Sequence, residues 1–158
     1  MKYQLLKSII FIALLLPLGA AGQSQNQLEE KDGYFYKNGM LYTGQHKEFY
    51  DNGNLRVQMK IVNGLKDGQV ILYHENGEKH EQQTYVEGLK SGEWKTWNDS
   101  GVQTGLAFYN RNKKDSTWII WDDKGQKRFE LHYDDGKKTG LWKMWDEKGN
   151  LINERAYE

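Results

Sequence analysis

The side chains that could do chemistry in this sequence are four histidines, a few paired aspartates and an unusual number of tryptophans. The histidines, His46, His74, His80 and His132, share no spacing typical of metal ligands. His46 also falls at a position that is tryptophan in later parts of the chain, which favours a packing role. The sequence therefore predicts solvated or packed histidines, with no metal site and no other cofactor.

The acidic and hydroxyl side chains give no stronger sign of catalysis. Asp122-Asp123 and Asp134-Asp135 could offer oxygen ligands to a hard cation, but neither pair has the spacing of a calcium loop. Solvated turn carboxylates are the favoured interpretation. No phosphate-binding glycine loop and no nucleophile elbow is present. We therefore expect no catalytic residues and no enzyme; a hydrolase would need carboxylates such as Asp122 and Asp134 to converge in a cleft.

The tryptophans belong to a sequence motif that recurs every 24 residues. Its first and second aromatic positions hold three tryptophan pairs, and a tyrosine follows at the same period: Trp94 and Trp97, Trp118 and Trp121, Trp142 and Trp145, then Tyr85, Tyr109, Tyr133 and Tyr157. A fixed period of this length marks a repeat architecture, in which each unit buries its apolar face against its neighbours.

Each unit has the pattern of strand, turn, strand, turn. Asp51-Asn52-Gly53 and its equivalents are turn sequences, and residues 55–61 alternate between apolar and polar side chains, as a strand with one solvated face does. The closing segments, such as residues 63–68, are predicted to be longer turns. Residues 110–116 lack both glycines of that segment, so we expect an irregularity or a contact there. The predicted fold is all-β, an elongated twisted antiparallel sheet of stacked β-hairpin repeats.

The chain divides into an N-terminal targeting segment, a cap and the repeats. Lys2 and Lys7, the apolar run 9–16, Pro17 and a small-residue stretch are typical of a secretory signal peptide cleaved near Gly22. The predicted parts are a signal peptide (1–22), a flexible leader (23–32), an N-terminal cap hairpin (33–43) and five repeats (44–67, 68–91, 92–115, 116–139 and 140–158). An uncleaved anchor is the alternative to cleavage, although the apolar run is shorter than a membrane span.

The repeat also resembles a known family. A unit of the form Gly-x-Trp-x-x-Trp, a turn ending in Gly, a strand ending in Tyr and a loop x-x-Gly-Lys-x-x-Gly resembles the variant MORN repeats of bacterial proteins, including the YwqK-like antitoxins. Residues 133–142 are the closest passage, and the resemblance runs from about Tyr42 to the end of the sequence. It implies an elongated sheet of stacked hairpins and an interaction role, with an antitoxin- or immunity-like function.

The aromatic residues allow two interpretations. Stacked between repeats, they would form the core of the sheet; exposed on one face, they would bind a partner. The candidate interaction surface is Trp94, Trp97, Trp118, Trp121, Tyr133, Trp142 and Trp145. Because the two tryptophans of a unit are three positions apart, either they point to opposite faces or a bulge brings them together.

Composition limits the partners. The 22 basic and 22 acidic residues balance, so no basic field would hold nucleic acid, and without cysteine there is no disulfide framework. We expect an exported protein, periplasmic or secreted, that binds a protein partner and has no membrane span. A cell-envelope glycan is the alternative ligand, and the last strand is a candidate edge for self-association or for a partner strand.

Overall fold

The computed structural model describes residues 28–158, so the predicted signal peptide and residues 23–27 of the predicted leader lie outside the described residues. Every regular element of the described part is a β-strand. The strands are β1 (Glu29–Lys31), β2 (Tyr34–Lys37), β3 (Met40–Leu41), β4 (Gly44–Phe49), β5 (Leu55–Val62), β6 (Leu65–Tyr73), β7 (Lys79–Val86), β8 (Leu89–Lys90), β9 (Gly92–Trp97), β10 (Gln103–Asn110), β11 (Lys113–Trp121), β12 (Lys127–Asp134), β13 (Lys137–Trp145) and β14 (Leu151–Tyr157).

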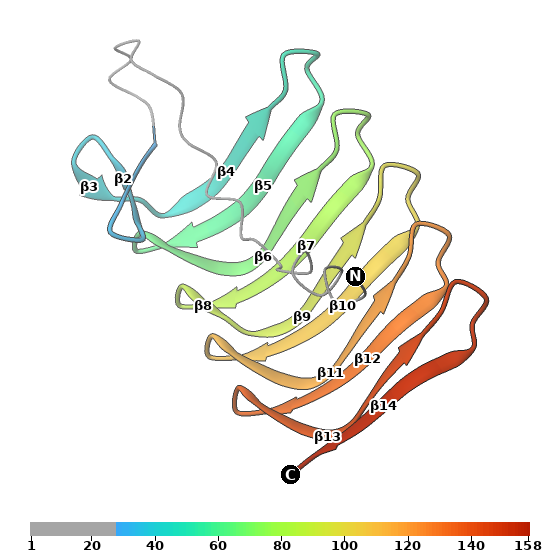
Figure 1. Cartoon of the computed structure of the whole chain (residues 1–158). Helices are drawn as coiled ribbons and strands as arrows, with labels where there is room; N and C mark the ends of the chain where they lie inside the picture. The colour runs from blue at the N-terminus through green and yellow to red at the C-terminus, as the bar shows by residue number, and fades with distance from the viewer. Residues whose placement is uncertain (1–27) are drawn as a thin grey trace.

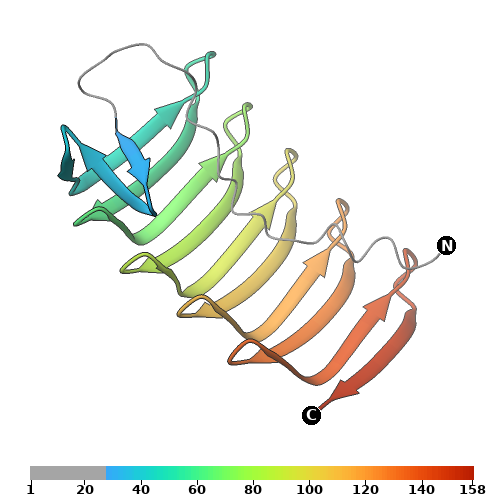
Figure 2. The ribbon, with the colours of Figure 1, turned by 60° about the vertical axis from the view of Figure 1, so that its left-hand side comes forward.

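The strands from β4 onward form one open antiparallel sheet of 11 strands. Its order follows the chain from β4 at one edge to β14 at the other, with β8 pairing to β7 beside the main path. Successive hairpins therefore stack side by side, and the sheet is elongated along the stacking direction and curved across it (Figures 1 and 2). The predicted fold class is confirmed.

A small three-stranded sheet of β1, β2 and β3 precedes the repeats. Phe35 N donates to Gly64 O at 2.8 Å, and Gly64 N donates to Tyr42 O at 2.8 Å, which ties this sheet to the turn between β5 and β6. Order begins earlier than expected, because residues 29–31 pair with β2 although they were assigned to the flexible leader. The polar sequence of residues 29–31 does not alternate between apolar and polar side chains as a half-buried strand does. These residues form a strand because their backbone pairs with the aromatic strand β2.

The loops that close each unit are tight two-residue turns, in contrast to the longer turns expected from the sequence. Both central residues have positive φ, at Asn63-Gly64, Glu87-Gly88, Arg111-Asn112 and Asp135-Gly136. This is the hairpin geometry whose twist matches that of the flanking strands. The strands consequently continue through residues that were assigned to loops, such as 65–68.

Adjacent closing turns are joined by hydrogen bonds. Gly88 N donates to Lys66 O at 2.8 Å, and Gly136 N donates to Lys114 O at 2.8 Å. At the turn that lacks glycine, Asn112 N donates to Lys90 O at 2.9 Å and Asn112 Oδ1 accepts from Lys90 N at 2.8 Å. The contact expected in residues 110–116 is therefore present, and the turn keeps the geometry of its equivalents.

Arg111 is the residue of these turns that should be easiest to improve. Its φ of 47° is left-handed, a conformation that asparagine tolerates better than arginine. Arg111→Asn should therefore raise the free energy of unfolding by about 0.5 kcal/mol, measured by urea denaturation. Arg111→Val is the matched control and should lower it, since a β-branched side chain resists positive φ; equal midpoints for the two variants would contradict the argument.

A one-residue bulge recurs in the second strand of every repeat. In the fourth repeat, Ile120 pairs with Phe129 and Trp121 pairs with Lys127, which leaves Arg128 without a cross-strand partner. The equivalent unpaired residues are Arg56, His80, Thr104, Arg128 and Ile152. Because the extra residue is on the neighbouring strand, the first strand of the unit stays regular from one tryptophan position to the other, and the two positions face opposite sides of the sheet.

A wider irregularity precedes the first tryptophan position. In β13, His132 pairs with Thr139 and Glu130 pairs with Lys143, so three residues, 140–142, lie opposite one. The backbone turns there through a positive φ at Gly68, Gly92, Ser116 and Gly140. Bulges bend and twist a sheet, so two per repeat account for its regular curvature.

Candidate interaction surfaces

The first tryptophan of each unit lies in a continuous aromatic ladder on one face of the sheet. Neighbouring rings are 4.8–5.4 Å apart between centroids and are tilted or edge-on. The ladder runs in the order Tyr85, Trp94, Tyr109, Trp118, Tyr133, Trp142 and Tyr157. We call this side of the sheet the ladder face.

Most of the ladder is core. Trp94 is 0% exposed, Trp118 3% and Tyr133 9%, while Trp142 is partly buried against them. Towards the N-terminal edge aliphatic side chains, among them Met59, continue the same core. Of the seven residues proposed as an interaction surface, Trp94, Trp118 and Tyr133 therefore have almost no surface to offer a partner.

The indole N–H groups donate hydrogen bonds to the neighbouring strand at the wide bulge. Trp94 Nε1 donates to Thr84 O at 3.1 Å, Trp118 Nε1 to Phe108 O at 3.0 Å and Trp142 Nε1 to His132 O at 3.0 Å. Each bond spans ten residues and reaches the preceding strand. Thr84 O also accepts from Ser91 N at 2.9 Å, so there the indole is a second donor. The tryptophan thus contributes a hydrogen bond, worth about 0.5–1.5 kcal/mol, as well as buried area.

The two tryptophan positions should differ in their effect on stability. Trp94→Ala should lower the free energy of unfolding by about 3–5 kcal/mol, because it removes a fully buried ring and one of the two hydrogen bonds to Thr84 O. Trp97→Ala, in the same strand, should cost less than half as much because Trp97 is only partly buried. Guanidinium unfolding curves of both variants provide the measurement, and similar losses would contradict the assignment of the ladder as the core.

A lysine near the start of the strand that follows each closing turn lies over the aromatic ladder. Lys90 Nζ is 4.7 Å from the centroid of Trp94, Lys114 Nζ is 4.4 Å from that of Trp118, and Lys138 Nζ is 4.5 Å from that of Trp142. Lys66 Nζ lies over Phe35 at 5.6 Å and Tyr85 at 5.3 Å. We call Lys66, Lys90, Lys114 and Lys138 the lysine row. Sequence reasoning missed it, although the 24-residue period contains it.

Burial changes the pKa values along this face. It lowers the pKa of Lys90, and the charge of Lys66 adds to that effect. Burial likewise lowers the pKa of Lys114, with a contribution from Lys138. Beneath them, burial raises the pKa of Tyr109 to about 12. The mutual influence of consecutive lysines is consistent with their facing the same side.

The second tryptophans form another row on the opposite face. Trp97, Trp121 and Trp145 are partly exposed and lie outside the core cluster, and Phe49, in the equivalent position of the first repeat, is 59% exposed. Lys127 Nζ lies 4.5 Å from the Trp145 centroid. These three tryptophans are the predicted site residues that keep accessible ring surface, apart from Trp142 at the end of the ladder.

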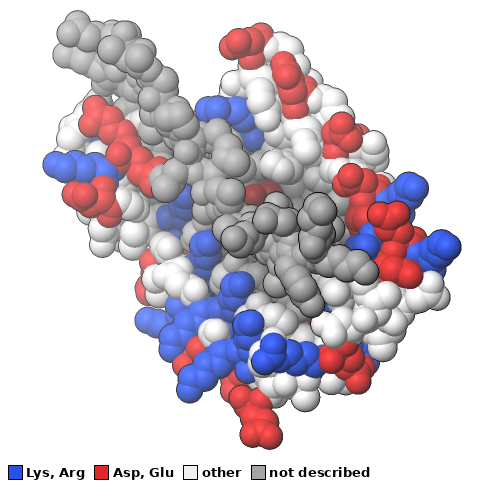
Figure 3. All heavy atoms as spheres, viewed as in Figure 1, with Lys and Arg blue, Asp and Glu red and all other residues white. Residues whose placement is uncertain are grey.

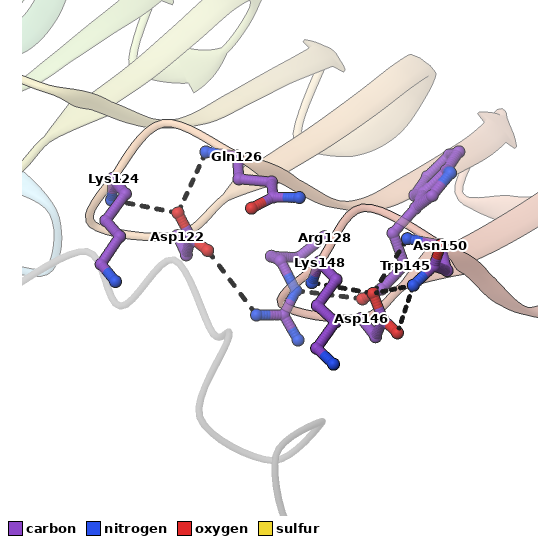
Figure 4. A network of polar contacts seen from close by, with 8 residues as sticks. All are labelled: Asp122, Lys124, Gln126, Arg128, Trp145, Asp146, Lys148 and Asn150. Carbon is purple, nitrogen blue, oxygen red and sulfur yellow. Dashed lines mark hydrogen bonds and ion pairs between the residues drawn. The ribbon is translucent and has the colours of Figure 1, made fainter.

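The acidic pairs considered as cation ligands have structural partners. Asp122 Oδ1 accepts hydrogen bonds from Lys124 N and Gln126 N, both at 3.0 Å, and Asp146 holds the next turn in the same way (Figure 4). Arg128 connects the two turns, since its Nη1 is 3.6 Å from Asp122 Oδ2 and its Nε donates to Trp145 O at 3.0 Å. In the described range, no three His, Asp or Glu side chains are arranged to hold a metal ion.

These hydrogen bonds lower the pKa of Asp122, chiefly through Gln126 N, and that of Asp146, chiefly through Asn150. A carboxylate with a lowered pKa stabilises the fold above its ordinary value of 3.8, and the stabilisation is lost as the pH falls through the folded-state value.

Asp122→Asn should therefore be less stable than the unmodified protein at pH 7, with the difference shrinking below pH 3.8. Urea midpoints at both pH values measure this. Asp123→Asn is the matched control, because that carboxylate neither holds the turn nor pairs with Arg128, and it should change little at either pH.

The histidines take part in local contacts. His46 Nε2 lies 3.0 Å from Glu48 Oε1, and His132 Nδ1 lies 3.0 Å from Thr117 Oγ1. The rings of His74 and His80 are 4.4 Å apart, and burial, followed by the charge of His74, lowers the pKa of His80.

A buried carboxylate that the sequence did not single out lies near the start of the ladder. Glu81 is 5% exposed, its Oε1 has no hydrogen-bond partner within the described structure, and burial raises its pKa. The raised pKa means that Glu81 destabilises the fold fully above the folded-state value and ceases to do so below about its ordinary 4.5.

Glu81→Gln should stabilise the protein by about 1 kcal/mol at pH 7, and the gain should shrink as the pH falls toward 4.5. Thermal unfolding across this pH range gives the test, with Glu78→Gln on an exposed turn as the matched control. A gain that persists unchanged at low pH would contradict the assignment of the cost to the buried charge.

An open antiparallel sheet with one hairpin per repeat, held by contacts between neighbouring units, defines an all-β repeat protein. The family described as MORN repeat variant matches residues 42–63, 66–87 and 138–158. The sequence resemblance to variant MORN repeats is thus confirmed in three repeats, and the structure extends the same hairpin to the units between them. No curated protein matches the chain. Within residues 28–158 there is no helix long and apolar enough to cross a membrane.

Proposed function

We propose that this protein is a non-enzymatic interaction module that binds a protein partner on its repeat surface. The observation that carries the proposal is the row of partly exposed aromatic side chains on the face opposite the ladder, repeated at the same position of successive hairpins. Exposed aromatic rings on a rigid scaffold are the side chains from which interface hot spots are built, and MORN repeats are consistent with such a role.

The test is capture of a partner by the tagged protein from separate envelope and cytosolic extracts of its source cells, read by mass spectrometry. A captured protein supports the proposal only if it binds the purified chain directly and if Trp121→Ala with Trp145→Ala weakens binding at least about tenfold, the loss of one hot spot. Arg111→Asn, in a closing turn, is the matched control and should bind normally. Direct binding by no protein, or binding unaffected by the double variant, rejects the proposal.

We also propose that the protein is exported, on the basis of the basic, apolar and small-residue pattern of residues 1–22. N-terminal sequencing of the protein from its native source should begin near Gln23. A mature protein that begins at Met1 would contradict cleavage. The resemblance to bacterial antitoxins further supports an antitoxin- or immunity-like role, which a captured partner with toxic activity, neutralised by this chain, would establish.

A second candidate ligand is a cell-envelope glycan. Trp97, Trp121 and Trp145 recur every second strand, a separation of about 9.4–9.8 Å, and an extended β-linked glycan presents equivalent sugar faces at a similar interval. Retention on isolated cell-wall glycan, lost in the double tryptophan variant and without any protein bound, would favour this alternative.

The edge strand β14 is a proposed site of self-association. Within the described part of the chain it pairs only with β13, and Leu151 and Ile152 are 50% and 54% exposed. An unpaired strand with exposed apolar side chains is a template for pairing. Light scattering over a concentration series should show dimers that Ile152→Lys abolishes; a monomer at every concentration would reject the proposal.

A further inference from the structure

The lysine row has the geometry of a linear binding site for anions. Its four ammonium groups come from equivalent positions of successive repeats, so they are two strands apart, or about 9.4–9.8 Å along the stacking direction. Figure 3 shows Lys and Arg gathered at the lower left, over the margin where β8 and the β10–β11 and β12–β13 turns lie in Figure 1. Asp and Glu are prominent toward the opposite ends of the hairpins.

The lysine row is not neutralised by ion pairs. Elsewhere lysines do find carboxylates: Lys113 pairs with Asp135, Lys127 with Glu130 and Lys95 with Glu93, each at 2.7 Å. Between residues 28 and 158 no member of the lysine row has such a partner; Glu81 acts on Lys90 only at longer range.

The rings beneath hold the row in place. Each ammonium lies over two aromatic rings, as Lys114 does over Trp118 at 4.4 Å and Tyr133 at 4.9 Å. Cation–π contacts of this kind are worth about 0.5–1 kcal/mol at exposed sites. They orient the lysine stems without removing their charge, so an incoming anion meets preorganised cations above an apolar floor.

The spacing selects one backbone conformation for a peptide ligand. In a β-strand, side chains three residues apart point to opposite faces. A polyproline II helix has three residues per turn and a rise of 3.1 Å, so every third side chain lies on one face at intervals of about 9.3 Å. This interval matches the separation of lysines in successive repeats.

We propose that the lysine row binds an acidic polyproline II segment of a partner protein, with a carboxylate at every third residue facing one lysine per repeat. The inference rests on the proposed protein-binding function and adds a second contact of the partner, with its own recognition chemistry, on the ladder face. A partner that also contacts the tryptophans of the opposite face therefore binds both faces of the sheet.

The test uses three labelled twelve-residue peptides and the full chain, with binding followed by fluorescence anisotropy. The first repeats Glu-Pro-Pro four times, the second contains the same four Glu and eight Pro with the Glu residues adjacent, and the third has Gln in place of Glu. The first peptide should bind at least about tenfold more tightly than the others, with an affinity that falls as salt is added. Equal binding of the first two peptides would overturn the spacing argument.

Matched variants locate the site. Lys114→Gln should weaken binding of the first peptide about threefold to fivefold, the value of one exposed ion pair, whereas Lys114→Arg should retain it. Lys127→Gln, a lysine stacked on Trp145 of the other face, should have no effect. Far-ultraviolet circular dichroism and a melting curve show that each variant is folded. An equal loss with Lys127→Gln would reject the lysine row as the site.

Two further experiments have separate purposes. One distinguishes other anionic ligands from the peptide, and the other distinguishes failure of this inference from failure of the proposed function. Binding to vesicles of anionic lipid or to a polyuronate in a Lys114-dependent manner, with no binding of the first peptide, would assign the row to another ligand. A captured protein partner that depends on Trp121 but not on Lys114 would keep the proposed function and reject this inference. Weaker binding of the captured partner both with Lys114→Gln and with the double tryptophan variant would support both proposals.

Discussion

Each indole at the first tryptophan position donates its N–H to a backbone carbonyl of the neighbouring strand, beside the wide bulge. The wide bulge beside this bond also bends the sheet, so curvature and core meet at the same side chain. At Thr84 O the indole is a second donor, because Ser91 N also donates to this oxygen at 2.9 Å. The unit of Val70 has the same irregularity without a tryptophan and packs with aliphatic side chains instead.

That arrangement places the two faces of the sheet in different roles. Trp118 is enclosed between Tyr109 and Tyr133 and serves packing, while Trp121, three residues later, keeps accessible ring surface on the other side. The short closing turns then bring one lysine per unit back over the packed rings, as Lys114 shows. A single 24-residue sequence motif thus specifies a core, an aromatic row and a cationic row, each repeated at the spacing of two strands.

Much of the fold could be predicted from the sequence, because period, turn glycines and alternation act locally. The closing turns were predicted too long since Gly64 and Gly68 look like one loop, whereas Gly64 serves a turn and Gly68 a bulge. Burial could not be predicted for the tryptophans: Trp94 and Trp97 are chemically identical, and only the register of the neighbouring strand separates them. Glu81 was also missed, because an acidic residue in a strand normally indicates the solvated face.

The loop-to-loop hydrogen bonds and the ring ladder both connect a unit only to the next one along. Such a molecule behaves thermodynamically as a row of coupled elements, in which cooperativity is set by the weakest junction. The ladder starts at Tyr85, and the hairpins before it are joined by Ile61 and other aliphatic contacts. Under tension applied along the stack, the sheet should therefore separate in steps of one hairpin.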